Sequence, residues 1–277
     1  MILFPNAKIN IGLNITGKRD DGYHNIVTLF YPVPWRDILE IVPAKGSETT
    51  LTVTGRYVDC PPEKNLVMKA YNALNDMISL PPVDIYLHKI IPDGAGLGGG
   101  SADASFTLTG LNRLFELGLS NDTLADIAAK LGADCAFFIY NRPRIARGIG
   151  NIFSDIDMDL SRYTIVIVKP SNGVSTAQAY SGVTPSMPPV SLEDLLKNDI
   201  SQWKDTVFND FEKSVFPLRP EIAAAKQSLY DMGAIYASMT GSGASLYGIF
   251  STDSDTLSAT VGTMFPDYDT LVQPLAL

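Results

Sequence analysis

The residues with the clearest chemical potential lie in a glycine-rich stretch from Pro92 to Ala104, with glycines at positions 94, 96, 98, 99 and 100. Residues 83–91 are rich in β-branched and aromatic side chains and predict a strand, whereas residues 101–117 carry apolar side chains at helical spacing. Glycine lets backbone N–H groups approach a ligand closely, and a helix N-terminus offers unpaired donors and the positive end of the dipole. A strand, a glycine loop and a helix in this order predict a binding site for phosphate groups.

Two well-known phosphate loops do not fit this stretch. A Walker A loop requires a lysine before its terminal Ser or Thr, and Gly100 precedes Ser101 here. The glycines formally match the dinucleotide pattern G-x-G-x-x-G, but that pattern requires a second parallel strand with an acidic residue about 20 residues further on. Residues 121–131 instead predict a helix, so a Rossmann-type oxidoreductase is the least favoured class. A flexible loop without a ligand is the remaining alternative, and the flanking strand and helix argue against it.

Three further groups of side chains are candidates for chemistry. Residues 7–16 alternate as in a half-buried strand, and Lys8 and Asn10 on its polar face either meet solvent or line the floor of a cleft. Tyr23 and His24 follow an Asp-Gly turn, where they either pack at a rim or hold a planar base. Asp134 lies between a predicted helix and an apolar run that predicts a strand; it either caps a helix, joins a buried network or serves as a base at the mouth of a pocket.

The composition sets the class of protein. The chain has 277 residues, of which 45% are hydrophobic and 18% charged, so a globular fold with a substantial core is expected. The formal charge of −9 disfavours nucleic acids and anionic membranes as partners. The two cysteines form no Cys-x-x-Cys pair, the two histidines have no nearby cysteine, and no apolar run is long enough to span a bilayer. We therefore expect a cytoplasmic protein without disulfides or a zinc site.

The order of predicted elements indicates an α+β protein with two domains. We expect residues 1–152 to form a nucleotide-binding domain around the glycine loop. After an irregular linker over 151–162, the chain predicts strands at 163–168, 234–239, 245–250 and 268–272, and helices at 220–232 and 256–264. This β-α-β-β-α-β order is typical of ferredoxin-like modules, so we expect residues 153–277 to form such a domain with inserted helices.

The motifs together resemble the GHMP kinases, which phosphorylate small metabolites, and the resemblance covers essentially the whole chain. Its carriers are Ala7–Leu13, Arg19–His24, Pro92–Ala104, Gly132–Phe138 and, more weakly, Thr240–Gly243. The glycine stretch is specific to this family. The Asp-Gly-Tyr-His segment and the opening Lys-x-Asn are similar to those of the members that phosphorylate a cytidine-diphosphate sugar alcohol in non-mevalonate isoprenoid synthesis. The resemblance implies a two-domain GHMP fold with a mixed N-terminal β-sheet and a C-terminal ferredoxin-like domain.

The resemblance also implies roles for residues in the ATP site. ATP would place its phosphates on the backbone of residues 92–102, and Asn65 and Lys89 match positions expected near the adenine. The implied ATP-binding residues are Asn65, Lys89, Pro92, Asp93, Gly94, Ala95, Gly96, Leu97, Gly98, Gly99, Gly100, Ser101 and Ala102. Mg²⁺ is implied as a cofactor, held largely by ATP and water, since no motif fixes its ligands.

For catalysis, Asp134 matches the base that takes the proton from the acceptor hydroxyl, and Lys8 matches its cationic partner. For the acceptor, the implied substrate-binding residues are Asn10, Tyr23, His24, Tyr180, Thr240 and Gly241. Tyr23 and His24 match the residues that hold the cytosine, and Tyr180 is a second stacking face. ATP and a cytidine-diphosphate sugar alcohol are therefore the expected partners, with the protein a monomer or a homodimer.

The chain departs from the family pattern at three places. Ala102 replaces a second serine, Cys135-Ala136 replaces Val-Pro, and Asn151 replaces a glutamate. None removes a charged catalytic group, although Ser101 is left as the only hydroxyl at its corner of the loop. Two alternatives stay open: a kinase for homoserine or mevalonate-like acceptors, which would not need a base-binding cluster, and a nucleotide-binding sensor without turnover.

Overall fold

A computed structural model describes residues 1–276, and the chain divides into two compact units. Unit 1 consists of residues 1–7, 35–93 and 98–142, and unit 2 of residues 8–34, 94–97 and 143–277 as far as the structure describes them. Each unit is therefore built from segments that are far apart in sequence. The domain boundary after residue 152 stays a prediction.

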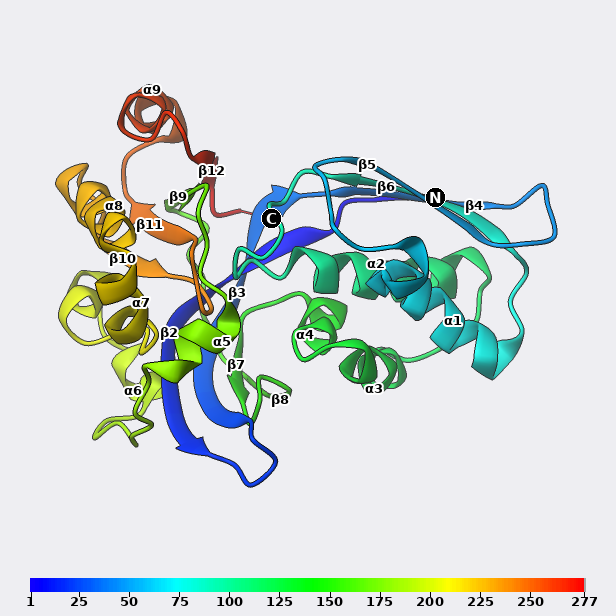
Figure 1. The fold of residues 1–277 in the computed structure, drawn as a ribbon, viewed down its shortest axis with the longest axis horizontal. Helices are drawn as coiled ribbons and strands as arrows, with labels where there is room; N and C mark the ends of the chain where they lie inside the picture. Colours follow the sequence, from blue (N-terminus) through cyan, green and yellow to red (C-terminus); the bar gives the residue numbers. More distant parts are fainter. Residues whose placement is uncertain (277) are drawn as a thin grey trace. The chain divides into compact units, whose positions relative to one another are not determined.

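Unit 1 contains a four-stranded mixed sheet with helices on one side, seen in Figure 1 as α1 to α4 lying along the sheet of β4, β5 and β6. The strand order is β1 (Ile2–Leu3), β4 (Ile38–Pro43), β6 (Val83–Lys89) and β5 (Thr50–Gly55). Only the β5–β6 pair is parallel among these strands. The helices are α1 (Leu66–Ile78), α2 (Gly99–Leu114), α3 (Asn121–Leu131) and α4 (Cys135–Tyr140), with a short 3₁₀ turn η1 (Pro62–Lys64) before α1. The mixed N-terminal sheet expected from the family resemblance is confirmed.

The helices of unit 1 begin where the sequence supplies a cap. The side chains of Asn65 and Ser120 accept hydrogen bonds from the first turns of α1 and α3. Helix α2 instead begins at Gly99, two residues before the predicted start, after Gly98 in a left-handed conformation. Helix α1 buries Val67, Ala70, Tyr71 and Leu74, whereas Met77 is 56% exposed.

Two predictions for irregular or extended segments were wrong. The apolar run after Asp134 forms helix α4 rather than a strand, with Cys135, Ala136, Phe137, Phe138 and Ile139 all buried. A short apolar run fits a buried helix as well as a buried strand, so its spacing alone could not decide. The predicted linker over 151–162 includes strand β8 (Ile152–Asp155), which pairs with β7 (Arg144–Arg147).

Unit 2 takes most of its first sheet from the N-terminal strands. The order is β2 (Asn6–Lys18), β3 (His24–Arg36), β7 and β8, and the first two residues of β2 and the last two of β3 belong to unit 1. Both faces of β2 are buried: Ile9 and Ile11 are inaccessible, and the polar Lys8 and Asn10 are only 3% and 2% exposed. The polar face of this strand is therefore not a solvated surface.

The second sheet of unit 2 has the ferredoxin-like arrangement predicted from the element order. Its strands lie in the order β10 (Tyr236–Met239), β11 (Leu246–Phe250), β9 (Thr164–Lys169) and β12 (Asp269–Pro274), and every pair is antiparallel. Helices α8 (Pro220–Asp231) and α9 (Ser254–Met264) bury Leu229 and Val261 in one core with these strands. The inserted elements are α5 (Thr176–Ser181), α6 (Leu192–Leu195), η2 (Ile200–Asp205) and α7 (Glu212–Leu218).

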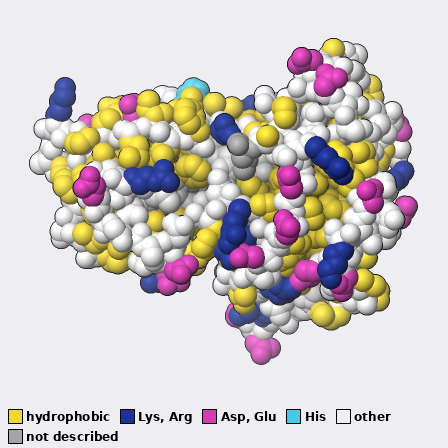
Figure 2. Space-filling model, turned by 180° about the vertical axis from the view of Figure 1, so that it is seen from behind, with side chains coloured by type: hydrophobic (Ala, Val, Ile, Leu, Met, Phe, Trp, Pro, Cys, Tyr) yellow, Lys and Arg dark blue, Asp and Glu magenta, His cyan; other side chains and the backbone are white. Residues whose placement is uncertain are grey.

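The surface charges are mixed. On the face shown in Figure 2, Lys and Arg side chains are scattered among Asp and Glu side chains rather than gathered into one stripe. Nucleic-acid binding usually needs a clustered basic surface, and this face does not provide one. In the described part of the chain, no helix combines the length and the apolar character needed to cross a membrane.

Candidate active site

The glycine loop owes its shape to glycines in backbone conformations that other residues rarely adopt. Gly94, Gly96 and Gly98 have φ angles of +59°, +73° and +73°. At Gly96 a side chain is also excluded by space, because a Cβ atom would lie 2.3 Å from the carbonyl oxygen of Thr240. Gly98 stands at the N-cap of α2 and has no side chain to accept from the first amides of the helix. These amides of the first turn are therefore directed at the space where an anion can bind.

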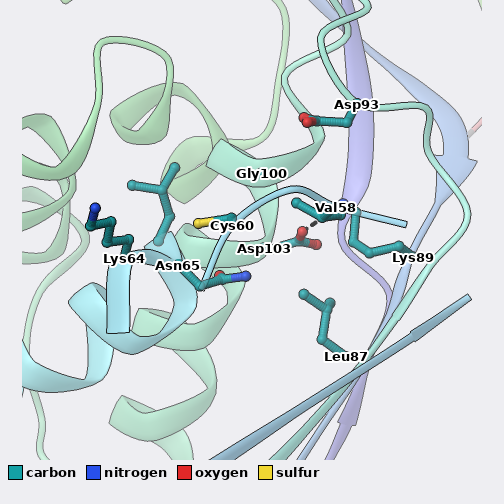
Figure 3. A pocket seen from close by; sticks show the side chains of 10 residues that line it. Val58, Cys60, Lys64, Asn65, Leu87, Lys89, Asp93, Gly100 and Asp103 are labelled. Atoms are coloured by element: carbon teal, nitrogen blue, oxygen red, sulfur yellow. Dashed lines mark hydrogen bonds and ion pairs between the residues drawn. The ribbon is translucent and has the colours of Figure 1, made fainter. Parts of the chain in front are cut away.

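A cavity of about 220 Å³ in unit 1 brings together four of the predicted ATP-binding residues, Asn65, Lys89, Asp93 and Gly100 (Figure 3). The remaining lining residues are Val58, Cys60, Lys64, Leu66, Leu87 and Asp103. The wall is apolar at Val58, Leu66 and Leu87, and it carries charge at Lys64 and on the glycine-loop side. An apolar wall beside a helix N-terminus suits a flat base that carries phosphates.

Lys89 lies at the centre of a buried ion cluster that sequence reasoning missed. Its Nζ atom donates to Oδ2 of Asp37 and, at 2.7 Å, to Oδ2 of Asp103, and all three side chains are nearly inaccessible. Burial lowers the pKa of Lys89, but the two carboxylates outweigh that effect and raise it above its ordinary value. The ammonium of Lys89 is therefore charged and neutralised by the protein, although its predicted place near the adenine stays a prediction.

Asp37 connects this cluster to the start of the glycine loop. Its Oδ1 atom accepts hydrogen bonds from the backbone N–H groups of Ile90 and Ile91, at 2.5 and 2.8 Å. These two residues directly precede Pro92, so one buried carboxylate fixes both Lys89 and the chain that enters the loop. The sequence held only a weak signal for it, an acidic residue immediately before an apolar strand.

Of the two carboxylates in the cluster, Asp103 has fewer hydrogen-bond partners than Asp37. Burial raises the pKa of its carboxyl to about 7, although Lys89 acts in the opposite direction. Its Oδ1 atom is buried and has no hydrogen-bond partner among residues 1–276. Asp103 lines the cavity, but this oxygen is itself inaccessible and stays unsatisfied among the described residues.

In unit 2, Lys8 is held by the loop and by its own strand. Its Nζ atom donates to the carbonyl oxygen of Gly96 at 2.9 Å and to Oδ1 of Asn10 at 2.8 Å, and it lies 4.9 Å from the centre of the Phe30 ring. Its backbone N–H donates to the carbonyl oxygen of Leu97. The first strand therefore positions both a cation and one side of the glycine loop.

Asn10 links Lys8 to the turn at residues 240–243. Its Oδ1 atom also accepts from the backbone N–H of Gly241 at 3.0 Å and lies 3.2 Å from Oγ1 of Thr240, while its Nδ2 atom donates to Thr28. Both polar ends of the Asn10 side chain are thus engaged by the protein. Its predicted contact with the acceptor, like those of Thr240 and Gly241, stays a prediction.

Asn209 is a second residue that sequence reasoning missed. Its Nδ2 atom donates to the carbonyl oxygens of Met239 and Gly241, at 2.8 and 2.9 Å, and its Oδ1 atom accepts from the N–H of Phe211. Asn209 is 1% exposed, so its role is to hold the surrounding backbone in place. It joins the turn that binds Asn10 to the start of α7.

The predicted base-binding residues lie together in unit 2. The rings of His24 and Tyr180 are stacked with centroids 4.6 Å apart and an interplanar angle of 19°, and the edge of Tyr180 packs on Phe211. Tyr23 is 62% exposed at the neighbouring hairpin. The facing sides of the His24 and Tyr180 rings are in contact with each other, whereas Tyr23 offers an exposed ring. Their binding of cytosine stays a prediction.

Asp134 stands at the turn between α3 and α4 in unit 1. It is half-buried at the N-cap position of α4, and its side chain does not cap that helix. The turn is fixed on the other side of Asp134 by Ser105, whose Oγ atom donates to the carbonyl oxygen of Cys135 at 2.6 Å. Burial raises the pKa of the Cys135 thiol to about 11, so this departure from the family pattern adds no charge beside the carboxylate.

The predicted site residues are thus gathered into two groups. Asn65, Lys89, Pro92, Asp93, Gly98 to Ala102 and Asp134 belong to unit 1, whereas Lys8, Asn10, Tyr23, His24, Gly94 to Leu97, Tyr180, Thr240 and Gly241 belong to unit 2. The pairing of Lys8 with Asp134 stays a prediction. Across residues 1–276, no group of three His, Cys, Asp or Glu side chains is placed to hold a metal ion.

Comparison with known proteins gives matches over most of the chain. The family model for the GHMP kinase N-terminal domain matches residues 65–142, and that for the C-terminal domain matches residues 191–267. A 4-diphosphocytidyl-2-C-methyl-D-erythritol kinase of Bacteroides fragilis is 55% identical over 253 residues, covering 91% of this chain and 92% of the relative.

Solved structures agree with these matches. A crystal structure of a 4-(cytidine 5'-diphospho)-2C-methyl-D-erythritol kinase superposes with a TM-score of 0.84 at 28% identity, covering 99% of this chain and 98% of the other. Homoserine kinase from Cytophaga hutchinsonii has a TM-score of 0.71 at 18% identity, with 98% and 94% of the chains covered. The latter likeness concerns the fold alone.

Proposed function

Because this chain belongs to the GHMP kinase family, we propose that it transfers a phosphoryl group from ATP to the C2 hydroxyl of 4-diphosphocytidyl-2-C-methyl-D-erythritol in the non-mevalonate route to isoprenoid precursors. The observation that carries this proposal is the 55% identity with the Bacteroides fragilis kinase across 91% of the chain. The stacked His24 and Tyr180 rings support a nucleoside-containing acceptor, since homoserine and mevalonate have no base to stack.

In this proposal the nucleotide occupies the cavity of unit 1. The base lies against Val58, Leu66 and Leu87, and the phosphates accept hydrogen bonds from the first amides of α2. Asn65 and Lys89 face the base. Lys89 is already paired with Asp37 and Asp103, so its ammonium adds no net positive charge to this part of the wall.

Two side chains carry the chemistry. The Asp134 carboxylate takes the proton from the acceptor hydroxyl, and the ammonium of Lys8 stabilises negative charge on the transferred phosphoryl group. Asn10 orients Lys8 through the 2.8 Å hydrogen bond, and the turn at Thr240 and Gly241 orients Asn10.

Magnesium bound to the triphosphate supplies further charge neutralisation in this class of reaction. The described residues form no three-ligand acidic cluster, which fits an ion held mainly by phosphate oxygens and water. The proposed setting is the cytoplasm, which the two free cysteines Cys60 and Cys135 favour. A monomer or a homodimer is proposed as the active species.

The test is ADP release by the purified protein with ATP, magnesium and one acceptor at a time: the cytidyl compound, homoserine or mevalonate. We expect turnover only with the cytidyl compound. Asp134→Asn is expected to retain nucleotide binding and lose most turnover, whereas Asp126→Asn, on the exposed face of α3, is expected to match the unchanged protein. Turnover with another acceptor would replace the proposed substrate. Nucleotide binding without turnover on any acceptor would favour a sensor.

A further inference from the structure

Asp93 is an unexpected residue for a loop that binds phosphates. It directly precedes the glycines, and its side chain lines the cavity of unit 1. It is exposed, and within residues 1–276 its carboxylate makes no hydrogen bond or ion pair with the protein. A free carboxylate beside a triphosphate weakens phosphate binding by repulsion. We therefore expect the Asp93 carboxylate to make a favourable contact with another part of the nucleotide, which would compensate for this repulsion.

The position of Asp93 along the cavity indicates which part that is. In Figure 3, Asp93 and Leu87 lie at opposite ends of the lining side chains, with Asp93 on the glycine-loop side. The apolar wall at Val58, Leu66 and Leu87 suits the base, and the first turn of α2 from Gly99 suits the phosphates. The sugar connects the two, and Asp93 lines the same cavity on the side of the phosphates.

We propose that the Asp93 carboxylate accepts hydrogen bonds from the 2′ and 3′ hydroxyls of the ribose and thereby selects ribonucleotides over deoxyribonucleotides. This inference rests on the proposed function, because it places ATP in this cavity. Two adjacent hydroxyls match the two oxygens of one carboxylate, and acidic residues read the ribose in this way in dinucleotide-binding sites. The other carboxylate on the cavity, Asp103, is 2% exposed and shares Lys89 with Asp37, so it is less accessible to a sugar.

The experiment measures dissociation constants by titration calorimetry for ATP, 2′-deoxy-ATP and 3′-deoxy-ATP in the presence of magnesium, with GTP and EDTA as two further arms. The proteins are the unchanged chain, Asp93→Ala and, as a matched control, Asp76→Ala, which removes an exposed carboxylate from α1 outside the cavity. We expect the unchanged chain to bind ATP about tenfold more tightly than either deoxynucleotide, as suits a hydrogen bond to a charged group. In Asp93→Ala this preference is expected to disappear through weaker ATP binding, and in Asp76→Ala to persist.

Three results would overturn the assignment. Equal strengthening of all three nucleotides in Asp93→Ala would mean that the carboxylate only repels phosphate. A lost preference for ATP over GTP, with the deoxynucleotide preference intact, would place Asp93 against the base. An Asp93→Ala effect that vanishes when magnesium is removed with EDTA would make Asp93 a metal contact. Absence of any nucleotide binding by the unchanged chain would instead overturn the proposed function, which separates the two failures.

Discussion

The Nζ atom of Lys8 donates a 2.9 Å hydrogen bond to the carbonyl oxygen of Gly96, across 88 residues of sequence. A cation from the first strand is thus fixed to the middle of the glycine loop before any ligand binds. The same carbonyl lies 3.2 Å from Oγ1 of Thr240. The position of the Lys8 charge therefore depends in part on the backbone conformation of Gly96.

Replacement of Gly96 by alanine tests this dependence. The new Cβ atom would meet the Thr240 carbonyl oxygen at 2.3 Å in a backbone with φ +73°. We expect a loss of about 2–5 kcal/mol of unfolding free energy, from strain and overpacking together, and nearly complete loss of turnover.

Gly94→Ala is the matched control, since Gly94 has φ +59° but no described heavy atom lies within 4 Å of its Cβ position. It should lose only about 1–2 kcal/mol. Urea unfolding and ADP release measure both effects. Equal destabilisation by the two substitutions would show that the contact with Thr240 does not matter.

Removal of the Asp37 carboxylate should damage nucleotide binding through the loop. Asp37→Ala leaves Lys89 with one carboxylate and leaves two backbone N–H groups without their acceptor. We expect a loss of about 3–5 kcal/mol of unfolding free energy and a higher KM for ATP, because Ile90 and Ile91 are released at the entry to the loop.

The control for Asp37 is Asp84→Ala on β6, where only a hydrogen bond from Thr50 is lost. It should cost about 0.5–1.5 kcal/mol and leave the KM for ATP unchanged. Chemical denaturation and steady-state kinetics make the comparison. An unchanged KM for ATP in folded Asp37→Ala protein would reject the positioning role.

Asp103 should make stability depend on pH. Its pKa is raised from 3.8 to about 7 in the folded protein, chiefly by burial, so between about pH 4 and pH 7 the unfolded chain has released a proton that the folded chain retains. The contribution of protonated Asp103 to the unfolding free energy is therefore complete at low pH. This contribution is lost as pH rises toward 7. Lys89 and Asp37 are the charged groups that face it.

Asp103→Asn removes this titration. Urea unfolding at steps between pH 4 and pH 8 should show the unchanged protein losing stability relative to Asp103→Asn as pH rises. A constant difference between the two proteins across that range would contradict the raised pKa.

Tyr23 provides a test of base binding with little risk to the fold. Its ring is 62% exposed, so Tyr23→Ala should unfold like the unchanged protein. If the ring stacks on cytosine, the KM for the cytidyl substrate should rise about tenfold or more, with little change in the KM for ATP. Tyr86→Ala, at an exposed tyrosine on β6, serves as the control. Equal changes in both KM values would argue against stacking by Tyr23.

The sequence predicted the elements whose signals are local. The strand, glycine loop and helix around residues 83–114 are confirmed, as is the ferredoxin-like order, because β-branched runs and helical spacing recur there clearly. The strand predicted for the short apolar run of α4 was wrong because length and periodicity cannot separate a buried six-residue helix from a strand. The family resemblance is confirmed by relatives that match along most of the chain.

The supporting residues could not be predicted because their partners are distant in sequence. Asp37 meets Lys89 across 52 positions, and Asn209 reaches Met239 and Gly241 across 30 and 32. No local pattern marks such pairs. Asn10 shows the same limit: its spacing left open a solvated surface or a cleft, and only tertiary packing revealed its links to Lys8 and Gly241.

The chain enters unit 2 at residue 8, leaves it after residue 34, returns for residues 94–97 and enters it again at residue 143. Unit 2 therefore needs segments synthesised both early and late, whereas unit 1 is made of segments that end at residue 142. On the ribosome, the ferredoxin-like strands emerge after the glycine loop, so Asn10 and Gly96 are translated long before their partner Thr240 exists. A ribosome stalled before the final third of the message would hold a complete glycine loop whose anchoring turn has not yet been made.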